Sequence, residues 1–393
     1  MVIKNVRIIT CQDSQVVEQG YVEVKEGKIT AVGQGEYTGN DPEVLDGQGG
    51  FLTPGFIDAH CHLGMWEEGL AFEGDDGNEE TDPCTPQLRS LDAINPRDRA
   101  FGEALSYGIT TVVTGPGSAN PIAGQICAMK TWGNVIDDMV VRFPCAMKFA
   151  LGENPKNTYS DKSQQPVTRM AIASIIREQL YKARRYQQDL ERSQEDEDTD
   201  PPDYDIKCEA LLPVLRRQIK AHVHAHRADD ICTALRLFRE FDLDGVIIHG
   251  TEGYLVADAI RKAGVPVVCG PIITTRGKPE LANACRENPM LLMEAGVPVS
   301  INTDANELPI DMLLTSAAIA AGAGSRPLPW EKALEMVTIR SAEAAGISDR
   351  VGSIAPGKDA DLCLFRQPPV GLLVRPEWVM IDGKFTHQSS NPL

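Results

Sequence analysis

The sequence predicts an α/β protein, a (β/α)₈ TIM barrel accompanied by a small β-sandwich domain that both chain termini build. Eight short apolar runs alternate with longer segments between residues 52 and 345, which is typical of repeated β-α units around a parallel sheet. Residues 1–52 and 346–393 contain runs in which apolar and polar residues alternate, as in half-buried strands. An open doubly wound sheet is the competing fold, but no glycine-rich dinucleotide loop follows the first apolar run. We therefore assign residues 53–345 to the barrel domain.

The strands expected at the two ends of the chain are short. Residues 1–50 alone bury too little surface to form a stable core, so we expect them to pair with matching segments near the C-terminus. Two unrelated tails are the alternative, and the clean alternation at both ends argues against it. The expected terminal strands are Val2–Ile9, Tyr21–Val24, Lys28–Val32, Ala360–Phe365 and Trp378–Lys384.

The barrel strands and helices follow from the spacing of apolar residues. One face of Thr168–Leu190 and one face of Asp229–Phe241 are apolar, which predicts two amphipathic helices. Residues 66–98 form an acidic insertion after the first barrel strand, either a lid over the site or a solvated loop, and residues 191–205 are predicted to be a surface excursion. The eight barrel strands are expected within residues 51–57, 109–113, 125–129, 145–151, 220–224, 246–248, 265–269 and 297–301.

The charge and cysteine content exclude several classes of function. A formal net charge of −18 argues against nucleic acid or an anionic membrane as a partner, because both would be repelled. The ten cysteines are scattered and contain no Cys-x-x-Cys pair, which predicts reduced thiols in a cytoplasmic protein. Neither a signal peptide nor an apolar stretch of roughly 20 residues is apparent. We expect a small-molecule substrate, and a homo-oligomer is compatible with the sequence.

Two histidines at the end of the first barrel strand give the first indication of chemistry. On a strand, residues two positions apart point to the same face, so His60 and His62 project together. Two neutral imidazoles at a rigid strand end are a half-site for a metal such as zinc. Two ordinary histidines at a strand edge are the alternative interpretation.

The remaining candidate residues lie at the ends of later strands, where a barrel places its active site. Six of the seven histidines fall at such positions, and only His387 lies elsewhere. This distribution favours a metal site over the alternative, in which core histidines only have their hydrogen-bonding groups satisfied within the protein. In chain order, the candidates are His60 and His62, then Lys148, then His222, His224 and His226, then His249, and finally Asp304.

The order His-x-His, Lys, His, His, Asp at the ends of strands one, four, five, six and eight resembles the amidohydrolase superfamily of metal-dependent hydrolases. The opening segment 53–62 and the closing segment 352–362 resemble the flanks of that superfamily, so the match spans nearly the whole chain. Gly152–Lys156 and His224–Ile231 resemble a branch close to imidazolonepropionase-like and dipeptidase-like members. The chain departs from close relatives at 305–307, where Ala-Asn-Glu replaces a pattern that usually includes a histidine.

The resemblance implies a set of metal ligands. His60 and His62 would hold the more buried of two zinc ions, Lys148 would bridge both ions as a carbamate, and Asp304 would contact the first ion and the hydrolytic water. His224 and His249 would hold the second ion.

Two of these ligand assignments have alternatives. A structural, salt-bridged Lys148 in a one-metal site is the alternative to the carbamate, which requires the neutral amine that burial favours. His226 is the alternative to His224 because it shares the same strand face, whereas His222 is expected to be structural.

The resemblance also implies a reaction, the cleavage of a C–N bond in an amide, N-acyl amino acid, dipeptide or cyclic amide by a metal-activated hydroxide. Asp304 would be catalytic, taking a proton from water and passing it to the leaving nitrogen. Arg227 and Arg276 are candidates for binding a substrate carboxylate, with a surface or structural role as the alternative for each.

Two other functions remain open alternatives. One is a deaminase with a single metal, although such members carry Glu three residues after the fifth-strand histidine, where this chain has Arg227. The other is a non-catalytic scaffold, although every ligand type is present.

Overall fold

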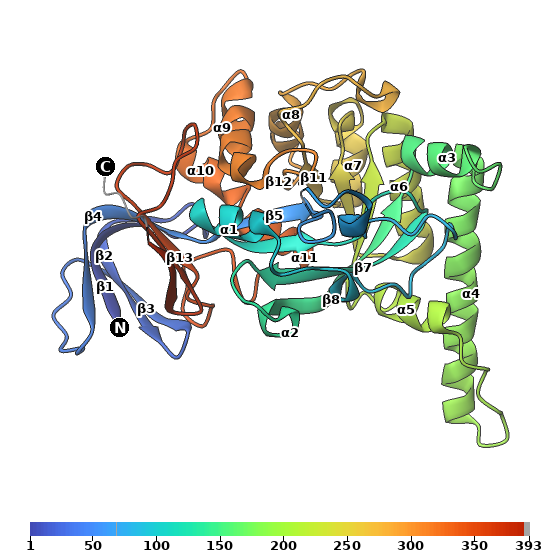
Figure 1. Ribbon diagram of the computed structural model, residues 1–393, viewed down its shortest axis with the longest axis horizontal. Helices are drawn as coiled ribbons and strands as arrows, with labels where there is room; N and C mark the ends of the chain where they lie inside the picture. The colour runs from blue at the N-terminus through green and yellow to red at the C-terminus, as the bar shows by residue number, and fades with distance from the viewer. Residues whose placement is uncertain (68, 389–393) are drawn as a thin grey trace.

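The computed structural model describes residues 1–67 and 69–388, which form two β-sheets and the helices that surround the larger one. In Figure 1 the smaller sheet lies at the left and the larger sheet, with its helices, at the right. The predicted mixed α/β architecture is confirmed. Within the described residues, every helix is too short or too polar to cross a membrane.

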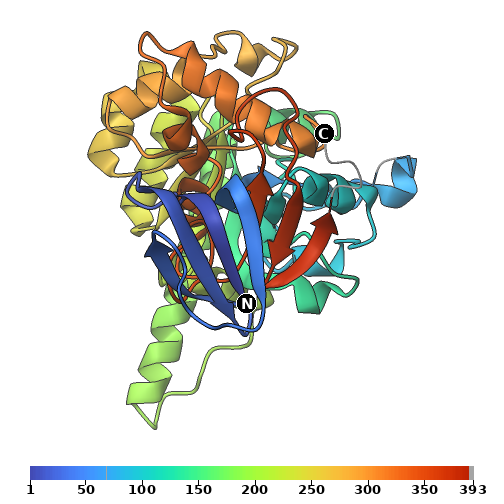
Figure 2. The same ribbon diagram turned by 90° about the vertical axis from the view of Figure 1, so that its left-hand side faces the viewer.

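Both ends of the chain contribute to the smaller sheet, as predicted. Its order is β15-β14-β13-β4-β1-β2-β3, and the two ends join where β13 pairs antiparallel with β4, for example Leu364 with Leu52. Apolar residues of both halves, such as Ile3 and Trp378, share one buried cluster. The predicted sandwich is therefore one continuous sheet around its own core, seen in Figure 2, and the exact domain boundaries stay predictions. The strands are β1 Val2–Ile9, β2 Val16–Lys25, β3 Lys28–Gln34, β4 Val44–Pro54, β13 Leu362–Phe365, β14 Trp378–Ile381 and β15 Lys384–Gln388.

The larger sheet has eight strands, and each of the eight predicted runs overlaps one of them. The first run is divided, because residues 51–54 belong to β4 and the barrel begins at Phe56, two residues after Pro54. The residue between is Gly55, where a Cβ atom would lie 2.0 Å from Thr110 Oγ1. The strands are β5 Phe56–Cys61, β6 Ile109–Thr114, β7 Ile122–Lys130, β8 Val140–Ala150, β9 Lys220–Ala225, β10 Gly245–His249, β11 Val267–Cys269 and β12 Val299–Ile301.

The prediction of an entirely parallel barrel is wrong at β7, which runs antiparallel to both of its neighbours. The physical reason is the length of the connections. Residues 115–121 lead into β7, and residues 131–139, with the one-turn helix α2 (Ile136–Met139), lead out of it. A parallel crossover needs a dozen or more residues, so these connections can only reverse the chain.

The barrel is nearly closed, because β12 and β5 meet at its mouth. There the Asp304 amide donates to His60 O at 3.2 Å, and the His62 amide donates to Ala305 O at 2.6 Å. Three residues earlier in each segment, the amides of Ile57 and Ile301 donate instead to the carbonyl groups of Val337 and Met336. The mouth thus joins the first and last strands directly at the predicted site residues.

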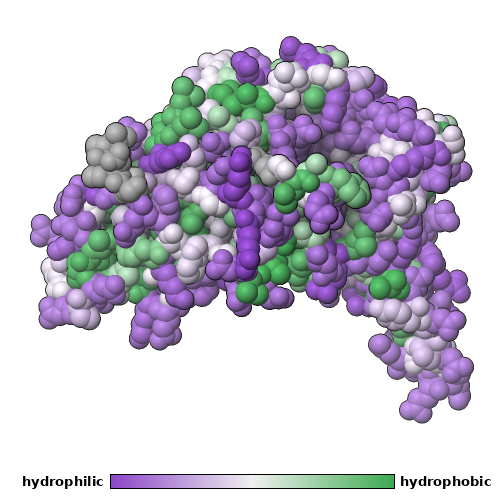
Figure 3. All heavy atoms as spheres, in the orientation of Figure 1, coloured by the Kyte–Doolittle hydropathy of each residue, from purple (hydrophilic) through white to green (hydrophobic). Residues whose placement is uncertain are grey.

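Helices cover the outside of the barrel. The two predicted helices are present as α4 and α6, and Thr168 Oγ1 caps α4 by accepting from the Ala171 amide at 3.1 Å. The far end of α4 projects from the body, and its surface is mostly hydrophilic (Figures 1 and 3). Apart from α2, the α-helices and their bounds are α1 Arg99–Ser106, α3 Glu153–Ser160, α4 Arg169–Glu195, α5 Ile206–Leu215, α6 Ala228–Phe241, α7 Ala257–Ala263, α8 Asn288–Glu294, α9 Leu313–Ala323, α10 Trp330–Glu335 and α11 Ile339–Ala345.

Short 3-10 helices lie in the loops. They are η1 Ala71–Gly74, η2 Ser90–Asp92, η3 Gly253–Leu255, η4 Pro279–Leu281 and η5 Ile310–Met312.

Candidate metal centre

One cluster of potential ligands forms where β5 and β12 meet. His60 Nε2 and His62 Nε2 lie 3.4 Å and 3.3 Å from Asp304 Oδ1. Zinc binds nitrogen and oxygen at about 2.0–2.2 Å, so tetrahedral ligands lie about 3.3–3.6 Å apart. The separations in this cluster therefore match those of ligands around one ion. All three side chains are buried or nearly so.

A buried carboxylate behind this cluster fixes the two strand ends relative to each other. Asp58 accepts hydrogen bonds from the His60 amide at 3.1 Å and from the Thr303 amide and hydroxyl at 3.1 Å and 2.5 Å. Burial raises the pKa of Asp58 to about 7, against the effect of these hydrogen bonds. Asp304 itself adopts a left-handed backbone with φ of 54°, a conformation that costs non-glycine residues about 1–3 kcal/mol. The surrounding structure thus holds Asp304 in place at a local cost.

A second cluster combines three histidines from β9 and β10. The rings of His224 and His226 have their centroids 4.5 Å and 4.4 Å from that of His249, and potential ligand atoms of all three lie within 4.8 Å of one another. The sequence left His224 and His226 as alternatives, and the structure places both in the cluster. His222 points elsewhere, with Nε2 3.0 Å from Ala344 O.

Hydrogen bonds orient several of these imidazoles. Carbonyl groups of Gly115 and Gly270 accept from Nδ1 of His62 at 2.7 Å and of His249 at 2.8 Å. The proton is therefore on Nδ1, which leaves Nε2 of both rings available as a metal ligand. A partner that fixes the tautomer in this way is usual behind metal-bound histidines.

Lys148 lies fully buried next to the first cluster. Its Nζ is 3.1 Å from His60 Nε2, and the ring centroids of His60 and His249 are 5.6 Å apart, so the two clusters adjoin. Burial lowers the pKa of Lys148 to about 8, with Asp304 opposing. The neutral amine is the form that reacts with carbon dioxide, and the lowered pKa increases its fraction, but the carbamate itself stays a prediction.

The protonation states fit a divalent metal. Burial lowers the pKa of His60, His224 and His249, which leaves these imidazoles neutral. Burial would raise the pKa of Asp304, but the surrounding histidines lower it well below its usual value. Neutral imidazole and ionised carboxylate are the forms that bind metals. Moreover, Asp304 Oδ1 and His224 Nε2 are buried and have no hydrogen-bond partner among the described residues, as expected for atoms that bind an ion.

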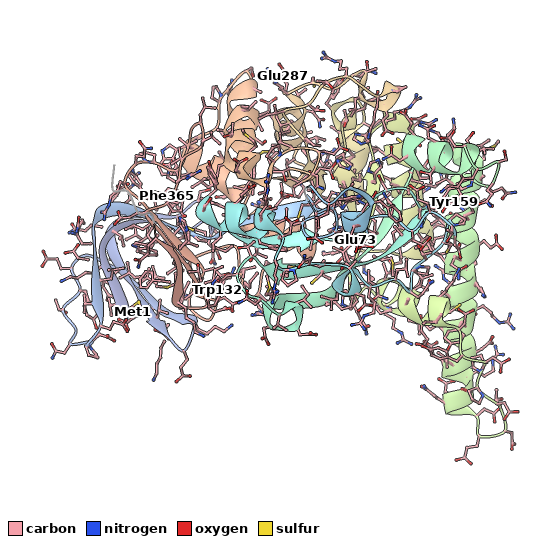
Figure 4. The ribbon with its side chains drawn as sticks, viewed as in Figure 1. Met1, Glu73, Trp132, Tyr159, Glu287 and Phe365 are labelled. Carbon is pink, nitrogen blue, oxygen red and sulfur yellow. The ribbon has the colours of Figure 1, made fainter. Side chains whose placement is uncertain are left out.

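Both clusters open onto a cavity of about 1010 Å³. Arg276, one of the two predicted substrate-binding residues, lines it and donates to Ala284 O at 2.8 Å. Arg227, the other, lies outside the lining and pairs with Asp229 at 2.9 Å, so its predicted role gains no support. Glu287 also lines the cavity and is labelled in Figure 4.

The insertion at 66–98 contributes to the same cavity. Trp66, Asn78 and Glu80 line it, and the Trp66 ring lies 4.7 Å from the His62 ring. Glu68, which also belongs to the predicted lid, lies outside the described residues. The position over the site agrees with a lid, whereas its movement stays a prediction.

Sequence reasoning missed one buried carboxylate at the second cluster. Glu280, in η4, is 1% exposed, and its Oε1 lies 3.8 Å from His224 Nε2 and 3.6 Å from His226 Nε2. Burial would raise the pKa of Glu280, but the contacts with His224 and His226 lower it to about 2. The residue lies in the long connection between β11 and α8, where no periodic pattern distinguishes it from the other acidic residues of the loops.

Comparison with known proteins identifies the family. A crystal structure of an amidohydrolase from Thermotoga maritima MSB8 has a TM-score of 0.92 and 38% identity to this chain, and the match covers 99% of this chain and all of that one. The chain belongs to the amidohydrolase superfamily. The Amidohydrolase family model matches residues 199–386 of this amidohydrolase.

Two curated relatives show the same relationship at lower identity. Amidohydrolase tasK of Hapsidospora irregularis is 28% identical over 95% of this chain, which spans only 40% of tasK. Imidazolonepropionase of Geobacillus kaustophilus (strain HTA426) is 23% identical, and the match covers 91% of this chain and 86% of that protein. The chain is thus a hydrolase of the amidohydrolase superfamily, whose members use a divalent metal.

Proposed function

We propose that this amidohydrolase is a zinc-dependent enzyme that hydrolyses a C–N bond in a small amide, such as an N-acyl amino acid, a dipeptide or a cyclic amide. The observation that supports the proposal is that two adjoining clusters of ligand atoms open onto one cavity. A scaffold would have no need of buried ligand atoms without hydrogen-bond partners, which cost about 1–3 kcal/mol each.

His60, His62 and Asp304 would hold the first ion, His224 and His249 would contribute to the second, and Lys148 could add a carbamate ligand. Bound zinc supplies a Lewis acid that lowers the pKa of water from 15.7 to about 7 and polarises a carbonyl group.

Side chains of the protein would transfer the proton and bind the substrate. Asp304 lines the cavity, where its carboxylate would accept a proton from the attacking water and deliver it to the leaving nitrogen. Arg276 offers a guanidinium group to a substrate carboxylate in the same cavity. Trp66, next to His62, limits the access of bulk water from the side of the insertion.

Metal analysis and a substrate screen on the zinc-reconstituted protein test the proposal. We expect about two zinc ions per chain and hydrolysis of at least one member of a library of N-acyl amino acids, dipeptides and cyclic amides. About one ion, together with ammonia release from a heterocycle, would replace the proposal with deamination. A protein that retains no metal and hydrolyses nothing would support the scaffold.

Replacing the proposed proton carrier gives a sharper prediction. Asp304→Asn keeps the size of the side chain but removes the base, so we expect kcat to fall by about 10²–10⁴-fold, the usual contribution of general acid–base catalysis. The measurement is steady-state kinetics on the best substrate from the screen. Asp349→Asn, which changes an exposed carboxylate outside the cavity, serves as the matched control. Equal kcat values for both variants would show that Asp304 moves no proton.

A further inference from the structure

We propose that Glu280, His224 and His226 form a three-residue metal subsite, which binds its ion without requiring a carbamate on Lys148. The inference rests on the proposed metal-dependent function and adds a ligand from the loop between β11 and α8.

Glu280 Oε1 is buried and lacks a hydrogen-bond partner among the described residues. It faces Nε2 of His224 at 3.8 Å and Nε2 of His226 at 3.6 Å, which is too far for a hydrogen bond. These nitrogen–oxygen distances are close to the separation of about 3.3–3.6 Å between two ligand atoms of a tetrahedral zinc ion. Three ligand atoms therefore surround a point where a cation fits, and two of them, Glu280 Oε1 and His224 Nε2, have no other partner.

Among the described residues, the negative charge of this carboxylate lacks a lysine or arginine partner. Within the part of the chain that the structure describes, the ion-pair contacts of Glu280 are with the two histidines alone, and neither lysine nor arginine reaches it. Burying a carboxylate without a cationic partner destabilises the folded protein by about several kcal/mol, because the charge loses its hydration. A divalent ion between Glu280 and the imidazoles removes that cost.

The second oxygen of Glu280 is fixed, which leaves the first free to bind a metal. Glu280 Oε2 accepts from the Glu153 amide at 3.2 Å, and Glu153 Oε2 accepts from the Glu280 amide at 3.1 Å. This reciprocal pair of hydrogen bonds attaches the loop to the first turn of α3. Outer hydrogen bonds of this kind hold a metal-binding carboxylate in one orientation.

His226 is held in the same way. Its Nδ1 lies 2.7 Å from Thr251 Oγ1, and its ring stacks on that of His249 with an interplanar angle of 9°. Nε2 of His226 therefore faces Glu280 in a fixed geometry. The strand pattern brings His224 and His226 to one face, and the loop supplies Glu280 as the third ligand.

Zinc titration of the full-length, chelator-treated protein tests the inference, with ions bound per chain and their affinities as the readout. We expect Glu280→Gln to weaken binding of one of the two equivalents by more than about 10–100-fold, because changes behind a ligand already cost that much. Glu294→Gln, which neutralises an exposed carboxylate of α8 outside the cavity lining, is the matched control and is expected to bind both equivalents. Lys148→Met is expected to retain the equivalent that Glu280→Gln loses.

Each result decides between the possibilities. Wild-type affinity for both equivalents in folded Glu280→Gln protein would overturn the inference while leaving the proposed function intact, and loss of the Glu280-dependent equivalent in Lys148→Met would also overturn it. If the wild-type protein binds no zinc, the proposed function fails with it. Should Glu280→Gln not fold, Glu280→Asp, which shortens the side chain but keeps its charge, is titrated instead, and unchanged affinity again overturns the inference.

Discussion

His62→Ala is expected to abolish hydrolysis and to remove the metal ion of the first cluster. The substitution deletes one of three ligand atoms, and the Nε2 that it removes lies only 3.3 Å from Asp304 Oδ1. Changes in the partners behind a ligand already cost about 10–100-fold in metal affinity, so we expect a loss beyond that range for the ligand itself. The measurements are zinc content after dialysis and kcat/KM on the substrate found in the screen.

The zinc content of His62→Ala distinguishes loss of the first-cluster ion from loss of both ions. We expect His62→Ala to retain the ion bound by the histidines of β9 and β10, so that one equivalent of zinc remains. His387→Ala is the matched control, because His387 lies on β15 of the terminal sheet, away from the barrel mouth. Full activity of His62→Ala would show that β5 does not contribute to the site.

The site could be predicted from the sequence wherever strand geometry determines the position of a side chain. His60 and His62 share a face because residues alternate along a strand, and the parallel strands bring His249 to the same mouth. Asp304 follows the same logic at the end of β12. Glu280 could not be predicted, because its position depends on the path of a long loop and on its hydrogen bonds with Glu153.

For the fold, too, local sequence patterns predict where the strands lie, but the direction of a strand depends on contacts and connections farther along the chain. Apolar runs indicate that a segment is a strand, and all eight barrel strands were located in this way. The direction of β7 depends instead on its connections, which are too short for a parallel crossover. The split between β4 and β5 was also missed, because both halves of the run are equally apolar and Gly55 alone marks the boundary.

The reversed strand has a structural consequence at the opposite end of the barrel. Because β7 is antiparallel, its last residue, Lys130, lies at the end of the barrel that adjoins the terminal sheet. There the Gly55 amide donates to Asp361 O at 2.9 Å, and the Phe56 ring contacts the ring of Phe365, which is labelled in Figure 4. The buried ammonium group of Lys130 contacts Asp361 and lies 3.0 Å from Asp359, so one side chain ties the barrel to the terminal sheet.

Lys130→Met is therefore expected to be among the most destabilising single substitutions in the protein. Asp359 keeps Arg350 and Lys28 as partners, but Asp361 loses its only lysine or arginine contact among the described residues and stays buried. Removing one partner of a buried ion pair typically costs about 3–5 kcal/mol, because the remaining charge is left uncompensated. The free energy of unfolding from denaturant titration, followed by both fluorescence and circular dichroism, measures the loss.

Two further variants distinguish this mechanism from a general effect of removing a positive charge. Arg217→Met breaks an exposed ion pair with Asp242 and is expected to cost no more than about 1 kcal/mol. In the double variant Lys130→Met, Asp361→Asn, the carboxylate charge is also gone while an acceptor for the Asp382 amide remains, so we expect part of the lost stability to return. If Lys130→Met were no less stable than Arg217→Met, the buried network would not be what joins the barrel to the terminal sheet, and the apolar contact of Phe56 with Phe365 would have to provide that attachment.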